Sequence, residues 1–360
     1  MATKPKAAAK GKGRAKAAPK RAAKGKASLA NDDIGEDTRL ALWRSLLEIR
    51  HVEQRAYDLF LQNLIKGTSH LALGHEAVAA GFATAMQKDD WSFCTYRGHH
   101  HTLARGASME GVLGELMGRQ CGLLQGKGGS MHISNLDVGM LGANGIVGAG
   151  APIAVGAGFG NKLKGNGNVS AAFFGDGSTN IGAFHEAANM ACALKLPVLF
   201  ICENNEYGEF TPRDQTMAIT DIVDRAAGYG MPGVIVDGMD VVAVHEAAVE
   251  AKARALRGEG PSLIEAKTYR FYNHHGVQNL GLKYRTDDEV SEWKERDPIF
   301  TFEDRMVEAG NATRDDFNTV WAELRADIAD AIQFADDSPA PDPEQLLVDV
   351  YTMSTEGAAS

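Results

Sequence analysis

Short apolar runs alternate with helix-like segments from residue 169 onward. The run VSAAFF at 169–174 predicts a buried strand, the segment 181–194 predicts a helix, and VLFIC at 198–202 predicts a second buried strand. The pattern then continues with helices at 222–228 and 240–257 and strands at 233–236 and 262–266. Strands and helices in this order predict an α/β fold with a mainly parallel sheet and helices on both faces.

Helical periodicity dominates both flanks of this region. Asp37 or Thr38 can cap a helix that ends near Gln62. Its apolar face is formed by Leu40, Trp43, Leu46, Leu47, Val52, Leu59 and Phe60. Further helices are expected at 74–86 and, in the C-terminal part, at 317–335. Residues 91–150 are rich in glycine and expected to be mostly loop, and 269–284 lacks periodicity and is expected to be a mobile loop.

The composition fits a soluble globular protein, because 44% of the 360 residues are hydrophobic and 23% are charged. We expect a basic tail at 1–31, one α/β domain with C-terminal helices at 32–340, and a C-terminal extension at 341–360. The four cysteines lack CxxC or other zinc-site spacing, which indicates reduced thiols and a cytoplasmic location. Between Asp137 and Lys162 lie 24 uncharged residues, but they are rich in Gly and Ala and predict a buried segment rather than a membrane span.

The positive charge is concentrated at the N-terminus. Residues 1–31 contain ten Lys or Arg and no acid, so the rest of the chain carries a net charge of −20 when the whole chain carries −10. The tail has almost no large apolar side chain and is predicted to be disordered. The acidic body argues against nucleic acid as the main partner. A tail-driven nucleic-acid-binding protein on a degenerate enzyme fold is the alternative from a different functional class.

Polar residues follow two of the predicted strands. Asp176, within Gly-Asp-Gly, and Asn205, within Asn-Asn, are 29 residues apart, which is about one strand-helix-strand crossover. Both should lie at the carboxyl edge of the sheet, where one carboxylate and neutral carbonyl oxygens suit a Mg²⁺ ion shared with phosphates. Taken alone, each motif is an ordinary turn or cap. The pair at this spacing is more specific and predicts a diphosphate site.

These two motifs resemble the thiamine diphosphate and Mg²⁺ motif of thiamine-dependent enzymes. The surrounding segments are similar, in order, to the α subunit of the heterotetrameric 2-oxo acid dehydrogenases, a family that includes pyruvate dehydrogenase and acetoin dehydrogenase. The similar segments are SHLALGHEA, YRGHHHTLARG, GKGGSMH, GANGIVGAG, GDGSTN, FICENNEYG, IVDGMD, TYRFYNHH and YRTDDEVSEWKERDPI. The resemblance extends from about residue 38 to the C-terminal helices and is greatest to acetoin dehydrogenase.

The resemblance implies a set of ligand-binding residues. Mg²⁺ would be bound by Asp176, Asn205 and the backbone carbonyl of Tyr207. The other implied cofactor contacts are Tyr96, Arg97, Gly177 and Ser178 at the diphosphate and the backbone of Gly145 and Val147 near the aminopyrimidine ring. Arg270 is a further basic candidate near the diphosphate, because arginine makes charge-assisted bonds to phosphate oxygens.

Two histidines match the family's active-site pair. His70 would hold or protonate the substrate oxygen, and His274 would serve the later acyl transfer, since an unperturbed histidine has a pKa of about 6.5. Without the resemblance, either one reads as a solvated surface residue. The run His99, His100 and His101 cannot direct all three rings at one ion, so loop packing and polar contacts near Arg97 are expected instead.

The resemblance also implies partners and a reaction. The carboxylate that activates the aminopyrimidine comes from a β subunit in this family, so we expect an α2β2 heterotetramer that passes acyl groups to a lipoylated acyltransferase. The substrate would be pyruvate or acetoin, with a branched-chain 2-oxo acid as the alternative. His275 and Lys283 occupy the two positions where the animal pyruvate enzymes carry phosphorylated serines, so control by that phosphorylation is not expected.

Overall fold

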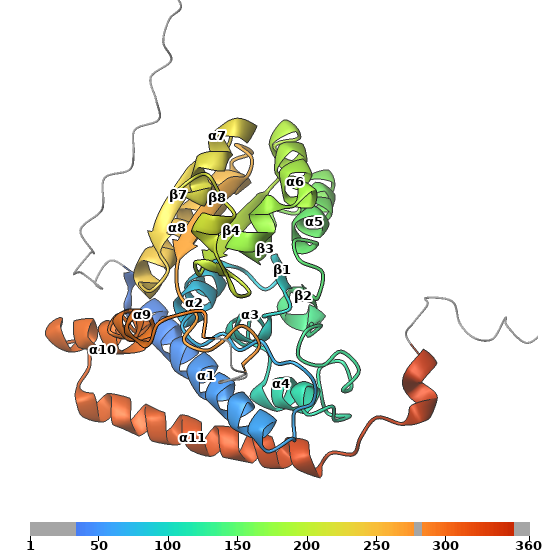
Figure 1. Ribbon diagram of the computed structural model, residues 1–360, viewed down its shortest axis with the longest axis vertical. Helices are drawn as coiled ribbons and strands as arrows, with labels where there is room; N and C mark the ends of the chain where they lie inside the picture. The colour runs from blue at the N-terminus through green and yellow to red at the C-terminus, as the bar shows by residue number, and fades with distance from the viewer. Residues whose placement is uncertain (1–33, 277–282, 349–360) are drawn as a thin grey trace, which may run out of the picture.

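The computed structural model describes residues 34–276 and 283–348. Three predictions concern segments outside the described residues: the basic tail at 1–31, the middle of the 269–284 loop and the end of the C-terminal extension. At the centre of the fold is a six-stranded sheet with the strand order β2-β1-β3-β4-β8-β7 (Figure 1). Every neighbouring pair in this sheet is parallel.

The strands agree with the predicted positions in the second half of the chain. In sheet order they are β2 (Met140–Asn144), β1 (Trp91–Thr95), β3 (Ser170–Gly175), β4 (Val198–Asn204), β8 (Ser262–Lys267) and β7 (Gly233–Asp237). The register pairs Gly175 with Glu203, so β3 and β4 end side by side. A short antiparallel hairpin of β5 (Tyr207–Gly208) and β6 (Thr211–Pro212) follows β4.

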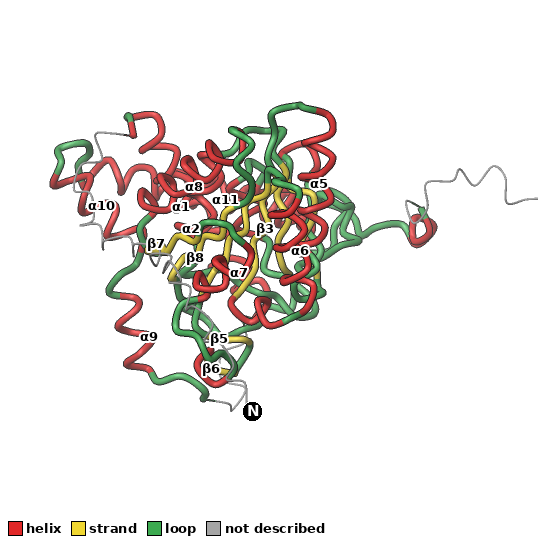
Figure 2. Tube along the Cα trace, turned by 90° about the horizontal axis from the view of Figure 1, so that it is seen from above, coloured by secondary structure: helices red, strands yellow, loops and turns green. Residues whose placement is uncertain are grey.

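Helices cover both faces of the sheet, as predicted. The helices of one face are α1 (Glu36–Leu61), α2 (Glu76–Ala85) and α8 (Val241–Leu256), and those of the other are α5 (Gly150–Lys164) and α6 (Gly182–Ala193) (Figures 1 and 2). Successive residues of β3 point to opposite cores, because side chains alternate along a strand. Phe173 packs in the core with α1, α2 and α8, and Phe174 packs in the core with α5 and α6.

A third core lies between the N-terminal half of α1 and the C-terminal helices. Leu42 and Leu46 of α1 pack there with Phe302 of α10 (Pro298–Glu308) and Phe317 of α11 (Arg314–Asp337). Figure 1 shows α11 running alongside α1 beneath the sheet. The chain continues through α9 (Asp287–Lys294) before α10 and ends its described part with a 3-10 turn at Pro343–Leu347.

The predicted start of α1 is wrong in detail. Neither Asp37 nor Thr38 caps the helix, because it begins after Gly35 without a side-chain cap, and Asp37 lies in the first turn. Leu40, predicted for the apolar face, is 43% exposed. By contrast, the oxygen Oδ1 of Asp240 accepts a hydrogen bond from the backbone of Val242 at 3.1 Å and caps α8.

The segment at 91–150 is rich in loops, as expected, but the sequence analysis missed the strands and helices within it. Two strands of the central sheet, β1 and β2, lie in it, together with α3 (His99–Ala104) and α4 (Met109–Leu116). β1 reads WSFCT and β2 reads MLGAN, so polar and glycine positions break up the apolar signal. These strands form because they pair with the sheet: Ser92 is fully buried between its neighbours.

The uncharged segment after Asp137 forms β2 and α5. No helix among the described residues combines the length and apolarity required to cross a bilayer. The expectation of a wholly buried segment is wrong for the outer side of α5, where Ile153, Phe159 and Leu163 are 46%, 40% and 72% exposed.

Candidate active site

The predicted site residues lie just beyond the carboxyl ends of five strands of the sheet. These are Tyr96 and Arg97 after β1, Gly145 and Val147 after β2, Asp176, Gly177 and Ser178 after β3, Asn205 and Tyr207 after β4, and Arg270 after β8. Because neighbouring parallel strands end at the same edge, this arrangement gathers the residues at one side of the sheet, where ligands of α/β proteins bind.

Asp176 opens the 3-10 turn Asp176–Asn180 and is 1% exposed. Its oxygen Oδ2 is buried and has no hydrogen-bond partner within the described part of the chain. Burial raises the pKa of this carboxyl to about 6, although the positive charge of Arg270 opposes the shift. A buried carboxylate oxygen without a donor fits the coordination of a cation.

Asn205 and Tyr207 lie on the turn after β4. Asn205 is buried, and its Oδ1 accepts a hydrogen bond from the backbone N–H of Tyr207 at 3.3 Å. The Tyr207 hydroxyl donates to Glu289 of α9 at 2.8 Å, and burial together with this carboxylate raises the pKa of Tyr207 to about 12. The side chain of Tyr207 is therefore used in the contact with α9. This fits a role in the site for the backbone of Tyr207 alone. A Cβ on Gly177 would lie 3.5 Å from the Cα of Gly208, so the turns after β3 and β4 meet closely.

Arg97 and Arg270 are buried cations, 5% and 1% exposed. Arg97 donates to the carbonyls of Leu71 and, at 3.0 Å, His274. Arg270 donates from Nη2 to the carbonyl of Glu209 at 2.9 Å, whereas its Nε and Nη1 have no partner. Burial and then the neighbouring Arg97 lower the pKa of Arg270 to about 10. Within the described residues neither guanidinium pairs with a carboxylate, so this part of the site fits an anion.

The rings of His70, Tyr96 and His274 form one cluster. The centroid of His70 lies 4.3 Å from that of Tyr96 and 4.9 Å from that of His274, and Tyr96 and His274 are 5.5 Å apart. Burial, and next the charge of Arg97, lower the pKa of His70 to about 3 and that of His274 to about 2. Both imidazoles are therefore neutral at pH 7, whereas the sequence suggested groups that titrate near neutrality.

Gly145, Val147 and Ser178 differ in their surroundings. Ser178 is 3% exposed and lies in the same turn as Asp176. Gly145 and Val147 follow β2, the edge strand, where the carbonyl of the Asn144 side chain accepts from the backbone of Ile146 at 2.8 Å. Val147 is 42% exposed and Ile146 is 71% exposed. The backbone here is thus accessible from outside the chain.

Arg285 supports the Arg270 segment and was missed in the sequence. Its Nη1 donates to the carbonyl of Arg270 at 2.5 Å and its Nη2 to that of Tyr272 at 2.9 Å. The guanidinium also lies 5.1 Å from the ring centroids of Tyr269 and Tyr284. Backbone carbonyls and aromatic faces leave no signature in sequence, so only the TYR and YRT motifs could have drawn attention to this contact.

The predicted run of histidines begins α3 instead of lying in a loop, but its polar contacts are confirmed. His99 lies 3.3 Å from Glu53 and 2.8 Å from Ser130, all three being buried. His100 and His101 turn instead toward Glu203, a buried residue of β4 that the sequence analysis missed. The available signal was an acid directly before the Asn-Asn pair, at the end of an apolar strand.

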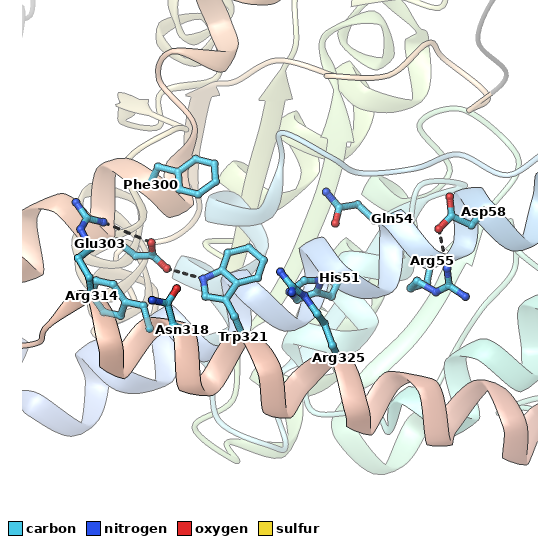
Figure 3. Close-up of a pocket in the computed structure, with 11 residues that line it drawn as sticks. His51, Gln54, Arg55, Asp58, Phe300, Glu303, Arg314, Asn318, Trp321 and Arg325 are labelled. Atoms are coloured by element: carbon cyan, nitrogen blue, oxygen red, sulfur yellow. Dashed lines mark hydrogen bonds and ion pairs between the residues drawn. The ribbon is translucent and has the colours of Figure 1, made fainter.

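A polar cleft of about 850 Å³ lies elsewhere, between α1, α10 and α11. Figure 3 shows its side chains, among them His51, Glu303, Trp321 and Arg325. The indole N–H of Trp321 donates to Glu303 at 3.0 Å. None of the predicted site residues lines this cleft, so it is distinct from the group at the strand ends.

The sequence matches the family described as dehydrogenase E1 component over residues 44–344. It is 44% identical over 325 residues to the α subunit of acetoin:2,6-dichlorophenolindophenol oxidoreductase of Bacillus subtilis, which covers 90% of this chain and 96% of that protein. It is 41% identical over 319 residues to the pyruvate dehydrogenase E1 component α subunit of Rhizobium meliloti, covering 88% and 91%. The somatic mitochondrial form from Homo sapiens is 40% identical over 314 residues, covering 87% and 79%.

Proposed function

Because the chain belongs to the dehydrogenase E1 component family, we propose that it is the α subunit of a thiamine diphosphate-dependent dehydrogenase that cleaves pyruvate or acetoin. The acyl group passes to a lipoylated acyltransferase. The observation that supports this most is that, at one sheet edge, a buried oxygen of Asp176 has no hydrogen-bond partner and two buried guanidinium groups have no acidic partner among the described residues. The carboxylate oxygen suits a cation and the guanidinium groups suit an anion, as Mg²⁺ and a diphosphate would supply.

Different residues of this sheet edge bind the two ligands. Asp176, Asn205 and the carbonyl of Tyr207 hold Mg²⁺. Arg97 and Arg270, with Tyr96, Gly177 and Ser178, bind the diphosphate, and the accessible backbone of Gly145 and Val147 contacts the aminopyrimidine ring. The free Nε and Nη1 of Arg270 are the donors available for phosphate oxygens.

Thiamine diphosphate, when bound, supplies a carbanion and an electron sink for breaking the carbon–carbon bond beside a carbonyl. The chain's own contribution is to orient the substrate and handle protons. His70 and His274 are neutral because burial and Arg97 lower their pKa values, so each imidazole offers one N–H donor and one acceptor. His70 hydrogen-bonds the substrate oxygen, and His274 faces the incoming lipoyl group.

The charge of a bound ligand affects the pKa values of these two histidines. A diphosphate bound to Arg97 and Arg270 partly cancels the two positive charges that depress their pKa values. Binding of the anion therefore opposes the part of the pKa lowering of His70 and His274 that comes from these charges, whereas the part that comes from burial, the larger cause, remains.

A β subunit completes the site and supplies the carboxylate that activates the aminopyrimidine, in an α2β2 heterotetramer. The apolar surface of this chain supports such an assembly. Ile153, Phe159 and Leu163 of α5 and Met190 of α6 are all at least 40% exposed and lie on helices of the same face of the sheet. All four cysteines are unpaired, which supports the cytoplasm as the location of the complex.

The test of this proposal is reduction of 2,6-dichlorophenolindophenol by the chain co-expressed with its β subunit, with thiamine diphosphate and Mg²⁺ present. Pyruvate, acetoin and a branched-chain 2-oxo acid are offered in parallel. We expect turnover with pyruvate or acetoin and none with the chain alone. Turnover only with the branched-chain acid would replace the proposed substrate, and no turnover in an assembly that binds the cofactor would contradict both proposed substrates.

A further inference from the structure

A second group of metal-ligating side chains lies inside the fold. His75 directly precedes α2, His100 lies on α3 and Glu203 lies on β4. One ligand atom from each of the three lies within 4.8 Å of the other two. The two histidines are fully buried, and Glu203 is 4% exposed. None of them is among the residues assigned to Mg²⁺ or to the diphosphate.

The spacing of the ligand atoms fits one ion. Nδ1 of His75 lies 3.5 Å and Nε2 of His100 lies 3.0 Å from the same oxygen, Oε1 of Glu203. Two ligands bonded tetrahedrally to zinc at about 2.0–2.1 Å are roughly 3.3 Å apart. Both histidine nitrogens therefore stand from the carboxylate oxygen at separations that suit ligands of one tetrahedral ion, and the two nitrogens lie within 4.8 Å of each other.

The hydrogen bonding of this group is incomplete. Among the described residues, Nε2 of His75 and Nδ1 of His100 have no hydrogen-bond partner, and Nδ1 of His75 has only its 3.5 Å contact with Glu203. Buried polar atoms are nearly always satisfied, so a fully buried histidine with such incomplete hydrogen bonding is costly. A ligand bound at His75 would remove this cost.

His101 lies beside this group but outside it, because the ligand atoms that lie within 4.8 Å of one another belong to His75, His100 and Glu203. Its Nε2 is buried without a hydrogen bond and lies 3.4 Å from Oε2 of Glu203. Its ring lies beside that of His100, with the centroids 3.9 Å apart. His99 points away, to Glu53 and Ser130, so only two members of the histidine run face this position.

The charge states suit ligation. Burial lowers the pKa values of His75 and His100, so both imidazoles are neutral, the form that binds metals. Arg97 and Arg270 lie close enough to oppose a cation here, so only an ion that forms strong bonds to imidazole nitrogen would bind.

We propose that His75, His100 and Glu203 form a three-ligand site for a divalent transition metal of the zinc class. Imidazole-rich sites select such ions over Mg²⁺ and Ca²⁺. The ion ties together α2, α3 and β4, and the chain segments that bear its ligands also bear His70, Arg97 and Asn205. It acts as a structural link beneath the site at the strand ends.

The experiment uses the full chain assembled with its β subunit, stripped of metal by a chelator and titrated with Co²⁺ in the absence of thiamine diphosphate. Visible absorption reports tetrahedral nitrogen-rich coordination. We expect one Co²⁺ per copy of this chain, displaced by Zn²⁺. The substitutions His75→Gln and His100→Asn should each weaken binding by at least about tenfold, the least that loss of even an outer contact to a metal ligand costs.

Two further variants separate the possible outcomes. His245→Gln replaces a half-buried histidine of α8 that contacts Thr84, at the end of α2 opposite to His75, and should leave Co²⁺ binding unchanged. Asp176→Asn should also leave it unchanged, because the Mg²⁺ site is separate. Absence of Co²⁺ binding to the unmodified chain would overturn the proposal without any reference to variants. Equal binding by His75→Gln and His245→Gln, or loss of binding in Asp176→Asn, would overturn it as well.

Discussion

The ionised form of Asp176 is poorly stabilised by the residues around it. Its carboxylate is buried with one oxygen unpartnered, and its pKa is raised to about 6 from 3.8. A raised carboxyl pKa means that the folded state resists ionisation, so above pH 6 the charge destabilises the fold by an amount that lies on the order of 3 kcal/mol. This cost is expected of a side chain retained for a ligand.

The substitution Asp176→Asn should therefore stabilise the ligand-free protein. We expect the free energy of unfolding at pH 7.5 to rise by about 1–3 kcal/mol, since the charge is removed and the shape is kept. The gain should shrink as the pH falls through 6, where the native carboxyl takes up a proton. Urea denaturation without Mg²⁺ measures it, with the exposed Asp224→Asn as control. A loss of stability in Asp176→Asn alone would mean that the carboxylate has a partner within the fold.

The low pKa values of His70 and His274 predict that the stability of the fold depends on pH. Folded His70 and His274 have pKa values of about 3 and 2, whereas an unfolded histidine has about 6.5. Between these values the unfolded chain binds more protons, so stability is present above pH 6.5 and is lost as the pH falls below it. Each histidine contributes at most about 1.4 kcal/mol per pH unit.

The double variant His70→Gln, His274→Gln isolates this effect. From pH 7.5 to 5.5 the ligand-free wild type should lose about 1–3 kcal/mol more stability than the variant, with His274 contributing less than the limit because it is only half-buried. The two proteins should change in parallel between pH 7.5 and 8.5, where neither histidine titrates. Parallel curves over the acidic range too would show that the histidines are not depressed.

Sequence reasoning reached some site residues and not others for a physical reason. Asp176 and Asn205 could be placed together because strand order and crossover length follow from the local pattern. The depressed pKa values of the histidines could not be predicted from the sequence, since they depend on Arg97 and Arg270 being buried next to them. The contact between His75 and Glu203 could not be predicted either, because it joins segments that are distant in the chain.

At the scale of elements, α9 anchors the turn that bears the proposed carbonyl ligand. Glu289 accepts hydrogen bonds from the hydroxyls of both Tyr207 and Tyr269, at 2.8 Å and 2.7 Å. This contact joins the short strand β5 to a helix that follows it by about eighty residues. The tyrosine ring thus fixes the position of the backbone whose carbonyl we propose as a ligand of Mg²⁺.

Tyr207→Phe tests this division of roles. Loss of a hydrogen bond to a charged acceptor should lower the free energy of unfolding by about 1–2 kcal/mol. Calorimetric affinity for thiamine diphosphate with Mg²⁺ should stay as in the wild type, since the backbone is retained. If Mg²⁺-dependent binding were lost in a folded Tyr207→Phe protein, the hydroxyl and not the carbonyl would be the functional group.

Elements were predictable where their own residues determine them. β3 and β4 are continuous apolar runs buried on both faces, and α8 is periodic and capped by Asp240. β1 and β2 are different, because Ser92 and Gly142 carry no strand signal and these segments become strands by pairing with the sheet. The missed strands are therefore those whose structure is dictated by neighbours.

For the whole molecule, the exposed apolar side of α5 marks a surface that another subunit should cover. Phe159→Glu places a charge there and should weaken assembly by about 1 kcal/mol or more, because the 40% of the side chain that is exposed would no longer gain from burial. Light scattering after size-exclusion chromatography measures the α2β2 fraction. Phe334→Glu is the matched control, because Phe334 is 56% exposed on α11. Equal assembly of the two variants would remove α5 from the interface.

The most direct test of the account is a calorimetric titration of the α2β2 assembly with thiamine diphosphate, with and without Mg²⁺. We expect one binding site per copy of this chain that requires Mg²⁺, and its loss in Asp176→Asn but not in Asp224→Asn. Binding that is unchanged in Asp176→Asn, or absent from the unmodified assembly, would contradict the assignment of the cofactor site to the carboxyl ends of these strands.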